Sequence, residues 1–259
     1  MNTRRVDYDQ LAEKFDHRYH PGQVSDTGKA LLELVAEANA QQILEVGCGT
    51  GHWLELLHRA DRFQVGVDYS RGMLTQAQAK GVPAQLVQGA ARQLPLRSGE
   101  MDLIYCLNAL HHFTSPENFI DEAKRVLRPG GILSIIGSDF PTSREDWYIY
   151  KYFNGVYEAD LEHFPPWEKI AYWLEKAGFI KHELVEVENI REHKKGADVL
   201  LDPFLQKHAC SQLALLSEQD YQEGLRKIES DLRLADENSQ EIIFKSEIAI
   251  MILSCSKAH

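Results

Sequence analysis

The hydrophobic and polar positions of this chain alternate between two kinds of segment. Short apolar runs of four to seven residues recur through the first half, as in strands buried on both faces of a parallel sheet. Between them apolar residues recur at helical spacing, as in residues 26–39, which Ser25 can cap, and in residues 117–127. This alternation predicts an α/β fold. The five apolar runs are residues 43–46, 63–68, 84–87, 101–107 and 132–136.

The first apolar run breaks into a glycine-rich segment, Glu45-Val46-Gly47-Cys48-Gly49-Thr50-Gly51. Glycine has no Cβ, so Gly47, Gly49 and Gly51 can take positive φ and let a ligand lie against the backbone. A helical pattern begins at His52, and the free N–H groups at its start would point at that ligand. The second run ends at Asp68, 21 residues after Gly47, where a carboxylate can accept hydrogen bonds from both hydroxyls of a ribose. The glycine-rich segment and Asp68 together predict a site that binds a nucleoside.

Two segments carry a resemblance to a known family. Residues 45–51, followed by Val65-Gly66-Val67-Asp68-Tyr69-Ser70, closely resemble motifs I and II of class I S-adenosylmethionine-dependent methyltransferases. Residues 123–133 match a characteristic segment of the ubiquinone/menaquinone-biosynthesis type. The resemblance covers roughly residues 43–137, and more loosely residues 7–42 and 165–257. It implies a Rossmann-like three-layer sandwich, with a mostly parallel seven-stranded sheet, an antiparallel last strand and a helical cap.

The resemblance also organises the C-terminal part. It implies that strands over residues 182–187 and 241–254 pair antiparallel, although about fifty residues with helical patterns over 198–215 and 218–234 separate them. Because the sixth strand runs parallel to the first, this insertion must emerge at the cofactor edge of the sheet. We expect one methyltransferase domain, residues 1–259, whose cap consists of residues 1–25, 138–166 and 189–240.

The resemblance implies that S-adenosylmethionine is the cofactor. The chain departs from the family pattern at Ala90, where an Asp commonly accepts a hydrogen bond from the adenine amino group. The backbone of Ala90 and Ala91 can still contact the ring, but recognition by a carboxylate is lost there. The residues expected to contact the cofactor are Glu45, Gly47, Cys48, Gly49, Gly51, Asp68, Tyr69, Met73, Ala90, Ala91 and Asn108.

Two groups of residues are candidates for the site of the methyl acceptor. His111 and His112 follow the fourth strand, where an imidazole could take a proton from the acceptor. Packing or cofactor positioning is the competing interpretation, because similar His-His-Phe runs occur in family members with unlike substrates. Nine aromatic residues lie between Phe140 and Trp167, and we interpret them as one wall of a pocket for an apolar or planar molecule. Aromatic packing under a surface helix explains them equally well.

The composition of the chain limits the classes of substrate and ligand that we expect. The net charge of −11 opposes a phosphate backbone, so we expect a small-molecule acceptor and no nucleic acid. The four cysteines are scattered, and no stretch approaches 18 apolar residues, so we expect a soluble, cytoplasmic protein without a membrane span. The histidines lack zinc-type spacing, so no metal is expected.

The predicted function is therefore methyl transfer from S-adenosylmethionine to a small, apolar or aromatic molecule by in-line displacement. Alignment of the two reactants can supply much of the acceleration, so a strong base is not required. Two alternatives remain. One is a non-catalytic protein that binds S-adenosylmethionine, and the other is an NAD(P)-dependent oxidoreductase. The sequence predicts neither the oligomeric state nor whether carbon, oxygen or nitrogen is methylated.

Overall fold

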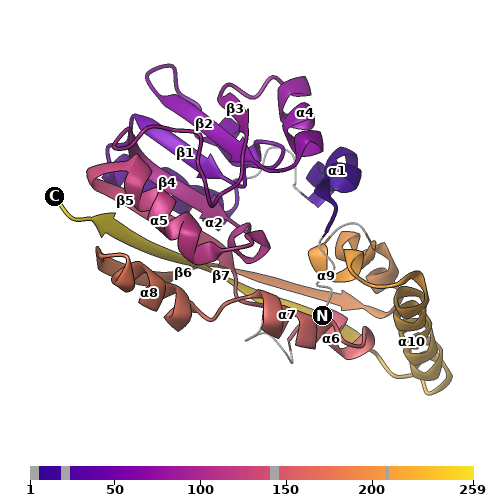
Figure 1. Ribbon diagram of the computed structural model, residues 1–259. Helices are drawn as coiled ribbons and strands as arrows, with labels where there is room; N and C mark the ends of the chain where they lie inside the picture. The colour runs from indigo at the N-terminus through magenta and orange to yellow at the C-terminus, as the bar shows by residue number, and fades with distance from the viewer. Residues whose placement is uncertain (1–5, 19–23, 141–145, 208–209) are drawn as a thin grey trace.

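The computed structural model describes residues 6–18, 24–140, 146–207 and 210–259, which form a seven-stranded sheet with helices around it (Figure 1). The strand order is β3-β2-β1-β4-β5-β7-β6. Strands β1 to β5 are parallel, whereas β7 is antiparallel to both β5 and β6. This confirms the predicted Rossmann-like sheet. The strands are β1 (Gln42–Val46), β2 (Phe63–Asp68), β3 (Gln85–Gln88), β4 (Met101–Leu107), β5 (Leu127–Ser138), β6 (Phe179–Lys195) and β7 (Ile243–Lys257).

Helices cover both faces of the sheet and make the three layers. Helix α2 (Asp26–Glu37) packs on one face, while α5 (Pro116–Val126) and α8 (Trp167–Lys176) pack on the other. Consecutive residues of β1 belong to different faces: Ile43 joins the α2 side and Leu44 the α5 side, and both are fully buried. Because side chains alternate between faces with a period of two, a strand covered on both sides reads as an unbroken apolar run.

The sixth strand is longer than its predicted span of residues 182–187. β6 continues to Lys195, so residues 189–195, assigned to the cap from the sequence, pair with the start of β7 at Ile243. The prediction was wrong because β6 is an edge strand whose side chains are mostly exposed. Its polar and charged residues therefore do not interrupt the strand, but they hide it from a search for apolar runs.

Two segments pack together to form the cap, defined here as residues 146–166 and 196–242. The helix predicted over residues 198–215 is broken into short pieces. The reason is local: Pro203 interrupts the pattern, and the Asp202 side chain accepts a hydrogen bond from Phe204 N at 2.9 Å and starts a new turn. The cap helices are α6 (Tyr148–Tyr152), α7 (Val156–His163), η4 (Gly196–Leu201), η5 (Pro203–Leu205), α9 (Ser211–Ala214) and α10 (Glu218–Glu237).

An N-terminal arm, residues 6–18, lies against the start of α4 (Arg71–Ala79), as Figure 1 shows for α1 (Tyr8–Leu11). Asp9 Oδ1 accepts hydrogen bonds from Ser70 Oγ at 2.6 Å and from Gly72 N at 2.7 Å. The arm continues as η1 (Ala12–Arg18). The described part of the predicted 1–25 cap segment therefore packs beside the end of β2, and residues 1–5 and 19–23 lie outside the described residues.

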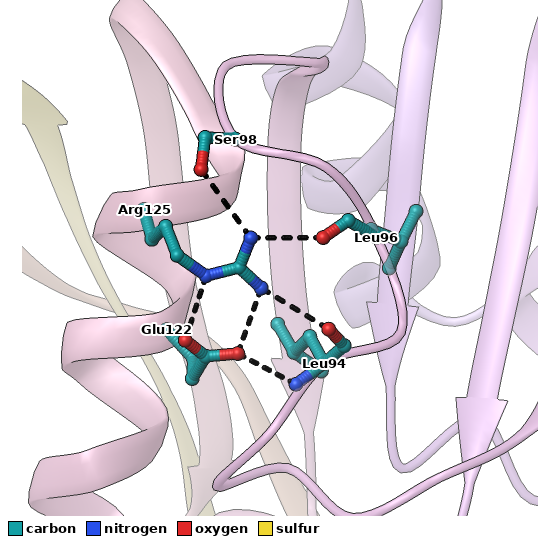
Figure 2. Close-up of polar contacts among 5 residues, drawn as sticks. All are labelled: Leu94, Leu96, Ser98, Glu122 and Arg125. Carbon is teal, nitrogen blue, oxygen red and sulfur yellow. Dashed lines mark hydrogen bonds and ion pairs between the residues drawn. The ribbon is translucent and has the colours of Figure 1, made fainter.

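The loop after β3 is fixed by a brace from α5, drawn in Figure 2. The Arg125 guanidinium donates to the carbonyl oxygens of Leu94 at 3.1 Å and Leu96 at 2.8 Å. Glu122 pairs with the same guanidinium at 2.7 Å and accepts from Leu94 N at 2.7 Å. Arg125, which belongs to the family segment 123–133, therefore fixes the loop that also carries Ala90.

Candidate active site

A cavity of about 2090 Å³ opens at the carboxyl ends of β1, β2 and β4 and extends between the sheet and the cap. This is the edge at which open α/β sheets bind their ligands. The walls come from the N-terminal arm, the glycine loop (residues 47–51), the strand ends and the cap. One continuous space therefore reaches both sites that the sequence predicts, the cofactor site and the acceptor site.

The glycine loop presents its backbone to this cavity. Gly47, Gly49 and Gly51 have φ values of +79°, +52° and +77°, which side-chain-bearing residues rarely adopt. A Cβ on Gly47 would lie 2.4 Å from the Ala109 Cβ, whereas one on Gly49 would meet only the Phe15 ring, at 3.6 Å. The loop thus needs glycine for both conformation and close approach.

Two of the predicted contacts in this segment serve the core instead. Gly51 does not line the cavity, and a Cβ there would come within 2.9 Å of the Val82 side chain, so its glycine is required by local packing. The Cys48 side chain belongs to a small apolar cluster with Leu54 and Ala77. Only the backbone of Cys48 is therefore available to a ligand.

Asp68, at the end of β2, ties the two loops of the site together. Its Oδ2 accepts a hydrogen bond from Gly49 N at 2.7 Å, and its Oδ1 accepts one from Ser70 N at 2.8 Å. Burial raises the pKa of this carboxyl above its ordinary value, although the backbone donors act in the opposite direction. Each oxygen has a second lone pair, so the carboxylate can also accept from two ribose hydroxyls.

Glu45 lines the cavity from within β1 and is 1% exposed. Its Oε2 accepts a hydrogen bond from the Tyr105 hydroxyl at 3.0 Å. Burial raises the pKa of Glu45 well above its ordinary value, because a carboxylate is poorly stabilised away from water. Glu45 is thus held in place beneath the glycine loop by a neighbouring strand.

The remaining predicted cofactor contacts line the same part of the cavity. Met73 is buried in the first turn of α4, and Tyr69 is 79% exposed at the mouth. Ala90 and Ala91 lie half-buried on the loop braced by Arg125. Asn108 follows β4 with a φ of +49°, and its Oδ1 accepts from Ser138 N at 3.0 Å.

The two predicted catalytic histidines lie where the cofactor region meets the cap, in η2 (Leu110–His112). The His111 ring stacks on Phe164 of the cap, with centroids 4.0 Å apart, and also contacts the His112 ring at 3.9 Å. Burial keeps the pKa of His111 well below its ordinary value, and positive charge on neighbouring histidines adds to this effect. His112 Nε2 lies 2.5 Å from the hydroxyl of Tyr8 in the arm.

The aromatic segment divides into two sets. Phe140, Trp147 and Phe164 line the cavity and contact one another in sequence, with Phe140 centroids 4.8 Å from Trp147 and 5.5 Å from Phe164. Tyr152 and Phe153 are instead buried in the cap core. Some rings of this segment therefore line the cavity, while others pack inside the cap.

The sequence analysis missed three polar residues of the acceptor side: Asp160, His163 and Gln212. Asp160 Oδ2 accepts hydrogen bonds from the Tyr150 hydroxyl at 2.7 Å and from Gln212 Nε2 at 3.2 Å. The spacing of Asp160 and His163, three residues apart in a helical segment, could have indicated a shared face. Nothing in the sequence places that face on the cavity.

Comparison with known proteins assigns the family. A family described as a methyltransferase domain matches residues 44–135. The chain is 32% identical over 154 residues to the uncharacterized methyltransferase sll0829 of Synechocystis sp.. The aligned region covers 57% of this chain and 71% of that relative. It is 28% identical over 178 residues to the 2-methyl-6-phytyl-1,4-hydroquinone methyltransferase of Spinacia oleracea, covering 66% of the chain and 49% of that relative. The chain belongs to the S-adenosylmethionine-dependent methyltransferases.

A solved structure shows the same fold. A methyltransferase from an antibiotic biosynthesis pathway of Anabaena variabilis, itself described as putative, superposes with a TM-score of 0.64 at 21% identity, covering 87% of this chain and 96% of that one. The cofactor of the family, S-adenosylmethionine, fits the residues present: an open backbone at Gly49 and a carboxylate at Asp68. Family membership therefore favours the methyltransferase over the oxidoreductase.

Among residues 6–18, 24–140, 146–207 and 210–259, no group of three or more His, Cys, Asp or Glu side chains could hold a metal ion. In the same part of the chain, no helix has both the length and the apolar character needed to cross a membrane.

Proposed function

We propose that this methyltransferase acts on a small molecule with an apolar or aromatic body. The observation that carries the proposal is the continuity of the cavity, which runs from the glycine loop to an aromatic wall formed by Phe140, Trp147 and Phe164. Aromatic side chains favour flat apolar ligands by stacking and edge contacts. A relative with a hydroquinone substrate adds support from outside the structure.

The cofactor residues have a positioning role in this proposal. When bound, S-adenosylmethionine supplies an electrophilic methyl group on a sulfonium sulfur. Gly47 and Gly49 allow close approach of its methionine part to the backbone, and Asp68 accepts from its ribose hydroxyls. Glu45 and Asn108 would hold the loops around that part, and Met73, Ala90 and Ala91, which line the cavity, would contact its adenine. Tyr69 closes the mouth.

The N-terminal arm helps to exclude water. Tyr8 and Phe15 line the cavity, and Tyr8 contacts His112. The arm therefore covers both the glycine loop and the segment that carries His111 and His112. Exclusion of water strengthens the polar contacts inside the site and protects the aligned reactants. His111 and His112 line this junction as positioning or proton-accepting groups.

A screen for methyl transfer tests the proposal. Labelled cofactor and a panel of phenols, quinone precursors, amines and carboxylates should give transfer to aromatic acceptors. Phe140→Leu should raise the KM for the best acceptor roughly threefold to tenfold, since an aromatic contact contributes about 0.5–1.5 kcal/mol. Tyr172→Leu is the control, because Tyr172 is 60% exposed on α8 away from the cavity. Transfer to aliphatic carboxylates only, with no effect of Phe140→Leu, would overturn the proposed acceptor class.

A cytoplasmic location and the absence of a nucleic-acid substrate stay predictions from composition. The free thiols of Cys48, Cys106 and Cys255 support a reducing compartment. The net charge of −11 supports a small-molecule acceptor.

A further inference from the structure

Helix α7 presents two ionisable side chains to the cavity that the cofactor loops do not use. Asp160 and His163 lie three residues apart, so they share a face of the helix. Both line the cavity beside the aromatic wall. Asp160 is only 5% exposed, and a buried ionisable group in a ligand cavity is a candidate for a functional role.

The His163 ring is held in one tautomer. Its Nδ1 lies 2.6 Å from the carbonyl oxygen of Ala159. A carbonyl oxygen can only accept, so Nδ1 carries the hydrogen and Nε2 of the neutral ring carries a lone pair. Nε2 has no hydrogen-bond partner among the described residues. The backbone therefore orients a proton-accepting nitrogen in the acceptor part of the cavity.

Asp160 favours positive charge next to this ring. Its two partners, the Tyr150 hydroxyl and the Gln212 amide, are neutral donors that bind Oδ2. Its other oxygen, Oδ1, has no partner among the described residues. Asp160 and His163 are close enough for their charges to interact. A carboxylate so placed stabilises an imidazolium that forms during reaction.

The two histidines that the sequence suggested are less suited to accept a proton. His111 stacks on Phe164 and against His112, and burial disfavours its charged form. His112 already contacts the hydroxyl of Tyr8. His163 combines a free lone pair with an adjacent negative charge.

We infer that His163 is the general base of the reaction and accepts the proton of a phenolic hydroxyl on the methyl acceptor. The inference rests on the proposed function. As the acceptor oxygen bonds to the methyl carbon, the bond from that carbon to the sulfonium sulfur breaks, and the hydroxyl proton moves to Nε2 of His163. Asp160 is the positioning residue that stabilises the charged ring. The same carboxylate repels acceptors that carry a carboxylate of their own.

Several titratable groups lie around His163. The proton-accepting ring must be neutral, so the rate should fall at acidic pH. Asp160 on its own helix and His111 on η2 are close enough to interact electrostatically with His163, and His112 on η2 and Cys210 before α9 line the same cavity.

Kinetics with matched variants test the base. His163→Asn keeps a donor near Ala159 but removes Nε2, and it should lower kcat by about 10²–10⁴-fold. The acid limb of the pH profile should disappear with it. The loss should shrink as phenols of greater acidity are used, because an ionised phenol needs no base. The control is His182→Asn, on exposed β6, which should match the unsubstituted enzyme. A loss that is equal for weakly and strongly acidic phenols would overturn the inference.

Asp160→Asn tests the positioning role. It keeps an oxygen for Tyr150 and Gln212 but removes the charge, so kcat should fall while KM changes little, and the loss should shrink as phenols of greater acidity are used. A loss that is equal for weakly and strongly acidic phenols would assign Asp160 a purely structural role and overturn this part of the inference.

A spectroscopic titration separates the inference from the proposed function. The complex with S-adenosylhomocysteine and 4-nitrophenol is titrated, and absorbance of the phenolate is followed. In the unsubstituted protein the bound phenol should ionise about one pH unit lower than in His163→Asn. Equal ionisation in both proteins would overturn the role of His163 and leave the acceptor class intact. Absence of phenol binding by the unsubstituted protein would instead overturn the proposed aromatic acceptor.

Discussion

The part of the cavity proposed for the cofactor and the part proposed for the acceptor, called the cofactor wall and the acceptor wall here, are built from different parts of the polypeptide. The cofactor wall is largely backbone: Gly47 N donates to Val67 O at 2.7 Å, and Gly49 N donates to Asp68 at 2.7 Å. The acceptor wall consists of side chains such as Phe164 and Asp160, which short cap helices bring together. The backbone of the cofactor wall can recognise the cofactor, which is the same for every acceptor. The side chains of the acceptor wall can be replaced one at a time without altering the sheet.

The two walls also treat buried carboxylates differently. Asp68 accepts hydrogen bonds from backbone N–H groups, which fix two loops relative to each other. Asp160 has side-chain donors only, and burial raises its pKa to about 6. The first arrangement organises the chain, while the second leaves a charge available to a reacting molecule. This difference can be tested by substitutions on each wall.

The largest effect is expected at Gly47. Gly47→Ala places a Cβ 2.4 Å from Ala109 Cβ at a φ of +79°, which should cost about 2–4 kcal/mol of unfolding free energy and weaken S-adenosylhomocysteine binding at least about 100-fold. Calorimetry and urea unfolding measure both. Gly81→Ala is the matched control, since its φ is +71° with open space around the new Cβ, so only the conformational cost remains. Equal losses in the two variants would show that close packing at Gly47 is unimportant.

The difference between the two walls also explains which parts of the fold and of the site could be predicted from the sequence. The five strands β1 to β5 and the glycine loop depend on contacts close in sequence or on unbroken apolar runs, and those features are visible in the residues themselves. The extension of β6 was missed, because an exposed edge strand of alternating charges has no apolar run. The antiparallel last strand was implied by the family resemblance rather than by any pattern in the apolar runs, and the order of the strands was not predicted.

The acceptor side could not be predicted to the same depth. His163 and His111 are 52 positions apart in the sequence, and only the packing of α7 on the sheet edge brings them near each other. Likewise, which aromatic rings face the cavity depends on how α6 and α7 pack with the later cap segment. Such contacts depend on tertiary structure, and a single sequence carries no local record of them.

At Asp68 the cofactor wall should lose affinity without losing its fold. Asp68→Ala should weaken cofactor binding by one to two orders of magnitude, roughly 1.5–3 kcal/mol for hydrogen bonds to a charged group. Isothermal calorimetry with S-adenosylhomocysteine measures this loss of affinity. Asp61→Ala, at an exposed ion pair with Arg59, should leave binding unchanged. Unchanged affinity in a folded Asp68→Ala protein would remove Asp68 from the cofactor site.

The acceptor wall should show the reverse, a gain in stability when its carboxylate is removed. Burial raises the pKa of Asp160 from 3.8 to about 6, so the folded protein retains a proton that the unfolded chain has already lost. Stability therefore falls as pH rises through the window from 3.8 to about 6 and stays reduced above it. Asp160→Asn removes this penalty and should be up to about 3 kcal/mol more stable at pH 8, with little difference near pH 4.

Urea unfolding of both proteins across this pH range measures the difference. Glu158→Gln, an exposed carboxyl on the same helix, provides the control and should change stability by less than about 0.5 kcal/mol at every pH. A pH-independent difference between Asp160→Asn and the unsubstituted protein would show that Asp160 carries no buried charge.

The smallest expected effect is a gain on the cofactor wall. Ala90→Asp restores the carboxylate that the family pattern places beside the adenine, and the loop that carries it is already held by Arg125. One added hydrogen bond from the adenine amino group should tighten S-adenosylhomocysteine binding by about 0.5–1.5 kcal/mol, at most about tenfold. S-inosylhomocysteine, which has an oxygen in place of that amino group, should gain nothing. If both ligands gained equally, the added charge would be acting on the site as a whole, and Ala90 would not lie at the adenine edge.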